Sequence, residues 1–164
     1  MLFILKTTAA AILALAFSAG IYRLIKYNII RKRLLVMLRE VAEIRNLKID
    51  EYQLLHEQIL GMDRRNGILI YLNYAHRINS RIIDLKEVTE CTLILKQVVA
   101  QLELTYRQPS RPPVSVCFYR KYSDPAFKRK SRVRKAVYWK ELITGSPFFG
   151  GETVVARELD EQAG

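Results

Sequence analysis

The chain opens with a long apolar run. Residues 2–22 (LFILKTTAAAILALAFSAGIY) carry one charged side chain, Lys6, close to their start. A helix rises about 1.5 Å per residue, so a run of this length covers roughly the 30 Å hydrocarbon core of a bilayer. Lys6 can extend toward one interface, and Tyr22 suits the other. We therefore expect a transmembrane anchor within residues 1–28, in contact with the bilayer through residues 2–22.

Two other interpretations of this run compete with a retained anchor. A cleavable signal peptide is one, because residues 17–20 (FSAG) place small side chains behind an apolar stretch. A buried helix of a soluble domain is the other. Against cleavage, the first residues are mostly apolar, apolar side chains resume after the run, and the strongest basic cluster follows the run. The retained anchor is the interpretation we favour.

The apolar run is followed by a helical pattern. Leu34, Met37, Val41 and Ile44 recur at spacings of three and four, with charged residues between them. This pattern predicts a juxtamembrane linker helix within residues 29–51. It is too short to establish a coiled coil, so we favour a helix that packs on the following domain over a dimerising stalk.

From Tyr52 the pattern changes to short β-type runs separated by turn residues. Residues 68–74 (ILIYLNY) are apolar on both faces, as in a covered strand, whereas residues 101–107 (QLELTYR) alternate between apolar and polar positions. The prolines within residues 108–113 cannot donate to a strand ladder and separate the last strand from the others. The pattern predicts an antiparallel sheet or partial barrel of five to seven strands. The candidate runs are 57–63, 68–74, 81–88, 91–99, 101–107 and 114–122.

The last predicted element is an amphipathic helix. At 100° per residue its apolar side chains share one broad face, and Tyr138 points away from it. The residues of this face are Val133, Ala136, Val137, Trp139 and Ile143. Gly145 and Pro147 end the helix. We therefore expect an α+β fold with a β-rich domain over residues 52–145, Trp139 in its core, and a mobile C-terminal tail over residues 146–164.

These elements resemble a pleckstrin-homology-like domain of the kind found in membrane-tethered bacterial proteins. The resemblance covers about residues 52–145 and lies in the element order: strands joined by short turns, then the helix VRKAVYWKELI (133–143) with Trp139 on its buried side. It implies a binding or scaffolding role. It also implies that the turn between the first two predicted strands, which holds Arg64 and Arg65, contributes to binding a phosphoinositide headgroup. A solvated turn is the alternative.

The positive charge of the chain is unevenly distributed. The net charge is +11, and residues 1–33 contain six basic side chains and no acidic one. Five of these six follow the apolar run, so the positive-inside rule places the C-terminal domain in the cytoplasm and the N-terminus outside the inner membrane. The charge therefore belongs mainly to the region beside the anchor, and the remaining domain is only mildly basic.

A second basic cluster, KRKSRVRK (128–135), precedes the apolar face of the last helix. Basic residues at a helix N-terminus oppose the macrodipole, so helix stability does not explain them. A solvated surface, a contact with anionic lipid or an acidic protein, and a contact with nucleic acid are the three interpretations. Nucleic acid is the least favoured, because the aromatic residues near the cluster are scattered. The candidate contact residues are Arg64, Arg65, Lys128, Arg129, Lys130 and Arg132.

Catalytic and metal-binding motifs are not evident in the sequence. Cys91 and Cys117 form no CxxC pair, and His56 and His76 are the only histidines. The most suggestive acids lie beside predicted turns and strand ends, where solvated carboxylates are the simplest interpretation. These acids are Asp63, Asp84, Glu87 and Glu90. We expect a scaffolding protein with no cofactor, no metal and no enzymatic activity, and a membrane-tethered nucleic-acid-binding module is the alternative.

Overall fold

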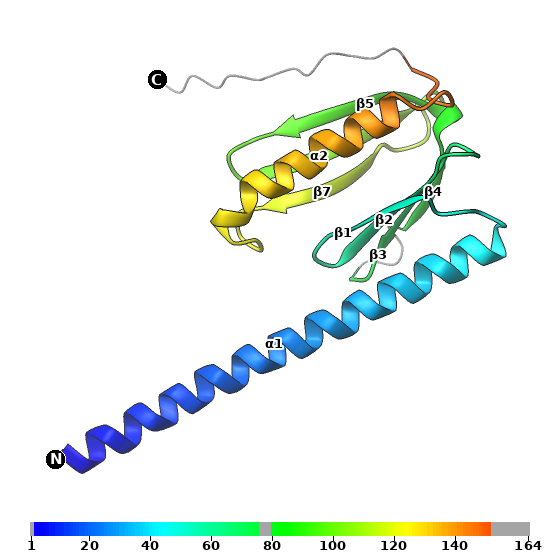
Figure 1. Ribbon diagram of the computed structural model, residues 1–164. Helices are drawn as coiled ribbons and strands as arrows, with labels where there is room; N and C mark the ends of the chain where they lie inside the picture. Colours follow the sequence, from blue (N-terminus) through cyan, green and yellow to red (C-terminus); the bar gives the residue numbers. More distant parts are fainter. Residues whose placement is uncertain (1, 76–79, 152–164) are drawn as a thin grey trace, which may run out of the picture.

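In the computed structural model, two helices enclose two small β-sheets (Figure 1). The structure describes the backbone of residues 2–75 and 80–151, and the side chains of these residues from 17 onward except 19 and 23. The elements are α1 (Leu2–Ile44), β1 (Glu51–Leu54), β2 (Gln58–Asp63), β3 (Ile68–Asn73), β4 (Arg81–Asp84), β5 (Val88–Leu95), β6 (Val99–Tyr106), β7 (Val114–Arg120) and α2 (Arg129–Thr144). Short 3-10 turns at Leu85–Glu87 and Ala126–Lys128 precede β5 and α2.

The strands form two antiparallel meanders. The first sheet has the order β1-β2-β3-β4 and the second the order β5-β6-β7. α1 lies along the first sheet, and α2 contacts all three strands of the second (Figure 1). The predicted α+β class, with antiparallel strands and one C-terminal helix, is confirmed.

The strand boundaries differ from the sequence prediction at two places. β1 (Glu51–Leu54) was not predicted, because four residues with little alternation give no local strand signal. The predicted run 81–88 is divided, because the Asp84 side chain accepts a hydrogen bond from the Lys86 N–H and starts a 3-10 turn. The turn that holds Arg64 and Arg65 therefore lies between β2 and β3, not between the first two strands.

The alternation of β6 is confirmed, with Leu102, Leu104 and Tyr106 buried. In β7, strict alternation from Val114 would place Tyr119 on the outer face with Cys117, but Tyr119 is buried. Gln101 pairs with Cys117 and Ala100 pairs with Tyr119, which leaves an extra residue in β7. Beyond this bulge, the last side chains of the strand point to the opposite face of the sheet from the one that strict alternation predicts.

The main core lies between the two sheets and α2. Trp139, Ala136 and Ile143 are the buried residues of α2, and Trp139 is only 2% exposed. The prediction that Trp139 belongs to the core is confirmed. Val137 packs at the margin of this core, and Val133 is half-buried.

The second apolar cluster joins α1 to the outer face of the first sheet. Ile30, Leu34 and Leu38 repeat every fourth residue and pack against apolar side chains of β2 and β3. A Cβ atom at Gly61 would lie 2.8 Å from Leu38 Cδ1, so this glycine allows the close approach of helix and strand. The predicted packing of the linker helix on the domain is confirmed, but Ile44 is 81% exposed instead of sharing the buried face.

One continuous helix, α1, covers both the predicted anchor and the predicted linker helix. In the part of the chain that the structure describes, no helix combines the length and the apolar character needed to cross a membrane. Most side chains of the predicted anchor, those of residues 2–16, lie outside the described residues.

The first residues of the predicted tail pack against the domain. Phe148 and Phe149 pack against the main core, and the Gly150 N–H donates to the Leu85 carbonyl. Phe148 packs over Gly67. A Cβ atom added at Gly67 would lie only 2.4 Å from the Cβ atom of Phe148. The backbone φ of Gly67 is +67°, so both the turn and the packing of Phe148 require a glycine there. The rest of the predicted tail, residues 152–164, lies outside the described residues.

Candidate functional site

The basic residues that precede and begin α2 lie beside the β5–β6 turn. The Lys121 N–H donates to the Val98 carbonyl at 2.9 Å, and the Arg129 guanidinium lies 3.5 Å from the Lys96 carbonyl. These contacts bring two segments that are distant in sequence to one end of the domain. We call residues 95–98 and 121–132 together the β7–α2 end.

The cations of the β7–α2 end have no ionic partner in the part of the chain that the structure describes. Within the described residues, none of Lys128, Arg129, Lys130 and Arg132 forms an ion pair. The first turn of α2 contains no acidic residue, and Lys128 at the N-cap makes no side-chain capping bond. Because the N-terminus of a helix is the positive end of its dipole, these charges are unfavourable for α2 itself. Burial lowers the pKa of the Lys135 ammonium, and the Arg132 charge lowers it further.

A groove of about 580 Å³ separates the β7–α2 end from α1. α1 contributes Lys26 and Tyr27 to its lining, the β1–β2 turn contributes His56, and the start of α2 contributes Lys128 and Arg132. The ring centroids of Tyr27 and His56 are 6.3 Å apart. The groove therefore places basic side chains from α1 and α2 on opposite walls.

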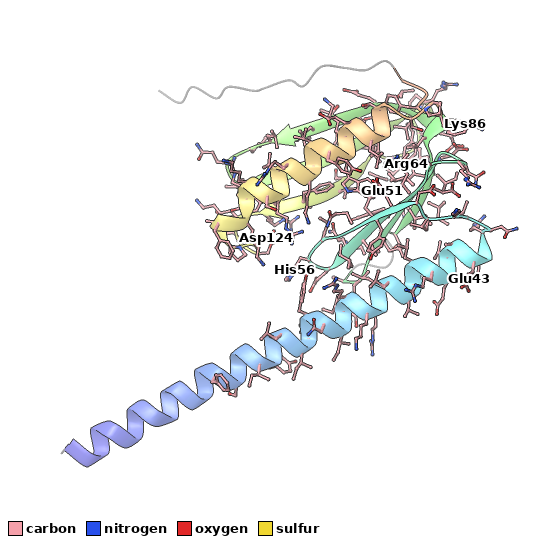
Figure 2. All side chains as sticks on the ribbon, viewed as in Figure 1. Glu43, Glu51, His56, Arg64, Lys86 and Asp124 are labelled. Atoms are coloured by element: carbon pink, nitrogen blue, oxygen red, sulfur yellow. The ribbon has the colours of Figure 1, made fainter. Side chains whose placement is uncertain are left out.

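This end of the domain faces the free length of α1. Figure 2 shows Asp124 and His56 on the side of the domain toward the N-terminal half of the helix, with Glu43 and Lys86 at the opposite side. The N-terminal part of α1, before the residues that line the groove, extends away from the domain (Figure 1).

The groove also holds a serine, a histidine and an aspartate, but their contacts are structural. The Ser123 hydroxyl donates to the Arg120 carbonyl at 3.3 Å, and the Asp124 carboxylate accepts from the Arg120 N–H at 3.0 Å. Both side chains thus hold the turn that follows β7. Among the described residues, no three His, Cys, Asp or Glu side chains converge as a metal site would require. His76 lies outside the described residues.

The predicted site residues Arg64 and Arg65 lie at the opposite end, in the β2–β3 turn. The structure does not bring them together with Lys128–Arg132. Arg64 forms an ion pair with Glu51 at 2.6 Å, and its N–H donates to Asp50. The Tyr138 hydroxyl also donates to Glu51, and this hydrogen bond raises the tyrosine's pKa. Arg64 is therefore engaged within the protein.

The turn itself is organised by Asp63. Its interpretation as a solvated carboxylate is wrong, because Asp63 is fully buried. One carboxylate oxygen accepts from the Lys48 N–H at 2.9 Å and the Asn66 side chain at 2.7 Å, and the other accepts from the N–H groups of Arg65 and Asn66 at 3.0 Å. Burial acts to raise the pKa of Asp63, but these hydrogen bonds outweigh it and hold the pKa below its usual value.

The two thiols lie in environments that suppress their reactivity. Burial raises the pKa of Cys91 to about 12. Cys117 is half-buried, its thiol donates to the Tyr119 carbonyl at 3.4 Å, and burial raises its pKa as well. Because the thiolate is the nucleophilic form, neither cysteine is prepared for covalent chemistry.

Sequence reasoning missed the most exposed aromatic residues of the domain. Tyr122 is 88% exposed and Phe127 is 80% exposed, and both belong to the β7–α2 end. The Lys128 ammonium lies 5.9 Å from the centre of the Phe127 ring. The available signal was local, since a lysine adjoins each aromatic residue on the two sides of the SDP turn in KYSDPAFK (121–128).

We compared the chain with known protein families, proteins and structures. No protein-family model, curated protein or solved structure matches the chain. Function is therefore inferred from the charge and geometry of the two ends of the domain.

Proposed function

We propose that the chain is a single-pass inner-membrane protein whose cytoplasmic pleckstrin-homology-like domain binds the anionic membrane surface and serves there as a scaffold for protein partners. The observation that carries this proposal is the β7–α2 end. Its cations have no ion-pair partner among the described residues and oppose the dipole of α2, and two of them, Lys128 and Arg132, line the groove beside α1. Residues that cost helix stability and meet no internal partner favour an external one.

The pleckstrin-homology-like assignment is supported by the order of the elements. Four antiparallel strands, then three antiparallel strands, then one helix packed on the second sheet follow the seven-strand-plus-helix pattern of that family. The assignment concerns residues 51–144, and α1 is an addition to it.

The membrane anchor is proposed from the sequence of residues 2–22, which contains a single charged side chain. A reporter fused after Gly164 should behave as cytoplasmic, and the protein should remain with membranes after carbonate extraction. Periplasmic reporter activity, or a mature N-terminus near Gly20, would contradict the anchor.

Anionic lipid headgroups would supply negative charge opposite the unpaired cations of the β7–α2 end. Each lysine or arginine near an anionic leaflet contributes about 1 kcal/mol of attraction, and this attraction decays within a Debye length of about 8–10 Å. Lys128, Arg129, Lys130 and Arg132 are all exposed or half-buried and can reach such a surface. Binding through these residues should therefore weaken steeply as the salt concentration rises.

A fragment without the proposed anchor tests this contact. Residues 24–164 retain Ile30 and Leu34, and with them both apolar clusters. This fragment should co-sediment with vesicles that contain phosphatidylglycerol at low salt, and most of this binding should be lost toward physiological salt. It should bind phosphatidylcholine vesicles much more weakly.

The decisive variant replaces Lys128, Arg129, Lys130 and Arg132 with Gln, and the matched control replaces Arg64 and Arg65 with Gln. The first should lose most of its co-sedimentation with an unchanged melting curve, and the second should bind like the parent. Equal binding by both variants would overturn the proposal. Salt-dependent binding of short duplex DNA, lost in the first variant without any response to anionic lipid, would instead support a nucleic-acid-binding module.

A further inference from the structure

The exposed apolar side chains of the domain are concentrated at the β7–α2 end. Among the described residues from 51 to 151, six large apolar side chains are exposed, and four of them belong to this end. These four are Leu95, Val98, Tyr122 and Phe127. Single exposed apolar residues are common, but a group of them on one surface indicates an interaction site.

The four side chains are interleaved with basic residues. Lys96 lies between Leu95 and Val98 in the β5–β6 turn, Lys121 precedes Tyr122, and Lys128 follows Phe127. The hydrogen bond from the Lys121 N–H to the Val98 carbonyl holds the two segments side by side. Aromatic and aliphatic side chains bordered by lysine and arginine are typical of segments that lie in the membrane interface.

The groove beside α1 shows next to which residues of this helix the β7–α2 end lies. Leu24 and Lys26 line the groove opposite Ser123, Asp124 and Pro125, which connect Tyr122 to Phe127. Leu24 and Lys26 follow Tyr22, the end of the proposed span, by two and four residues, or about 3–6 Å of helix rise. Each polar layer of a bilayer is about 5–7 Å thick. With residues 2–22 in the bilayer as proposed above, the β7–α2 end would lie at the depth of the headgroups.

We infer that the β7–α2 end is a second membrane contact, in which Tyr122 and Phe127 insert into the interfacial layer and Leu95 and Val98 lie against it. This inference rests on the proposed function, because it takes its depth from the anchor. The occupant of the surface is the bilayer itself. The domain is then fixed at two points, α1 and this end, and the apolar contact persists at salt concentrations that screen the neighbouring cations.

The test uses the full-length protein reconstituted in vesicles whose lipids carry bromine on their acyl chains, a quencher of tryptophan emission. Phe127→Trp places a reporter at the proposed contact. Tyr52→Trp is the matched control, because Tyr52 is also an exposed aromatic residue, at 55%, and lies on β1 in a groove lined by the C-terminal part of α1. The native Trp139 contributes the same background to both variants.

Bromine should quench the added emission of the Phe127→Trp variant several-fold more than that of the Tyr52→Trp variant. The difference should appear in phosphatidylcholine as well as phosphatidylglycerol vesicles and at high salt. Equal quenching of the two variants would overturn the inference. If the reporter at position 127 is not quenched while the 24–164 fragment still needs its four cations to bind anionic vesicles, the inference fails and the proposed function stands.

A second pair of substitutions tests the same contact without a reporter. Tyr122→Ser with Phe127→Ser should leave the melting curve of the 24–164 fragment unchanged, because both side chains are almost fully exposed. The double variant should lose the part of vesicle binding that resists high salt and keep the part that depends on phosphatidylglycerol. Unchanged binding at high salt would contradict insertion.

Discussion

The two ends of the domain both carry basic residues, in the β2–β3 turn at one end and at the start of α2 at the other, yet these residues have different surroundings. At the β2–β3 end, the turn is fixed by the buried Asp63, and Arg64 is paired with Glu51. At the β7–α2 end, Lys128 and Arg132 meet no ionic partner within the described residues. At the first end, Asp63 and the Arg64–Glu51 ion pair hold the turn in place, whereas at the second end the cations have no ion-pair partner among the described residues.

The difference arises from the acids that the fold brings to each end. Asp50, Glu51 and Asp63 surround the β2–β3 turn, because β1 pairs with β2 in the register Glu51 to Met62. At the β7–α2 end the nearby Asp124 accepts a hydrogen bond from the Arg120 N–H and, among the described residues, forms no ion pair with the cations of this end. A basic pair in a turn is therefore informative about function only once its acidic neighbours are known.

The largest effect should come from Asp63→Ala. Four part-buried donors lose a charged acceptor. A hydrogen bond to a charged group contributes about 1.5–3 kcal/mol, and water can replace part of what is lost, so we expect a loss of roughly 3 kcal/mol in the free energy of unfolding. The control is Asp84→Ala, since Asp84 accepts a single backbone hydrogen bond. Urea unfolding of both variants measures the difference. A loss no larger than that of the control would mean that the turn does not depend on Asp63.

The pH dependence of stability should follow the same carboxylate. The folded pKa of Asp63 is lower than its unfolded value, so its contribution is present above the unfolded pKa of about 3.9 and is lost as the pH falls through the folded pKa. Between neutral pH and about pH 3, the urea midpoint of the parent should fall more steeply than that of Asp63→Asn. Parallel curves would show that Asp63 contributes no pH-dependent stability.

A smaller effect is expected from replacing the four cations at the β7–α2 end with Gln. Removing positive charge from the start of a helix relieves its repulsion by the dipole, by about 0.3–1 kcal/mol for a well-placed charge at low salt. The variant should melt at the parent's temperature or slightly above it while losing vesicle binding. A clear loss of stability would show that these residues serve the fold and would remove the contrast between the two ends.

The smallest effect should come from Arg64→Gln. Its ion pair with Glu51 is about half exposed, and exposed pairs contribute about 0.2–1 kcal/mol. Vesicle binding should be unchanged, because Arg64 lies at the other end of the domain. A loss of vesicle binding in this variant would extend the membrane contact to both ends.

Local periodicity was sufficient for much of the fold. The alternation of β6 and the helical spacing around Trp139 predicted which side chains are buried, because a strand or helix with one covered face repeats apolar residues at its own period. It failed where an element is too short to repeat, as in β1, and where a bulge reverses the facing of a strand, as at Tyr119.

The sequence by itself determined the α+β class, the apolar run before the domain, and the basic cluster at 128–135. Only the tertiary structure decided which charged side chains are paired and which distant segments lie side by side. Glu51 meets Tyr138, 87 positions later, and the β5–β6 turn meets the β7–α2 connection. Such meetings depend on the pairing of strands and the placement of α2, and residues so far apart in the chain leave no local periodic signal of their contact.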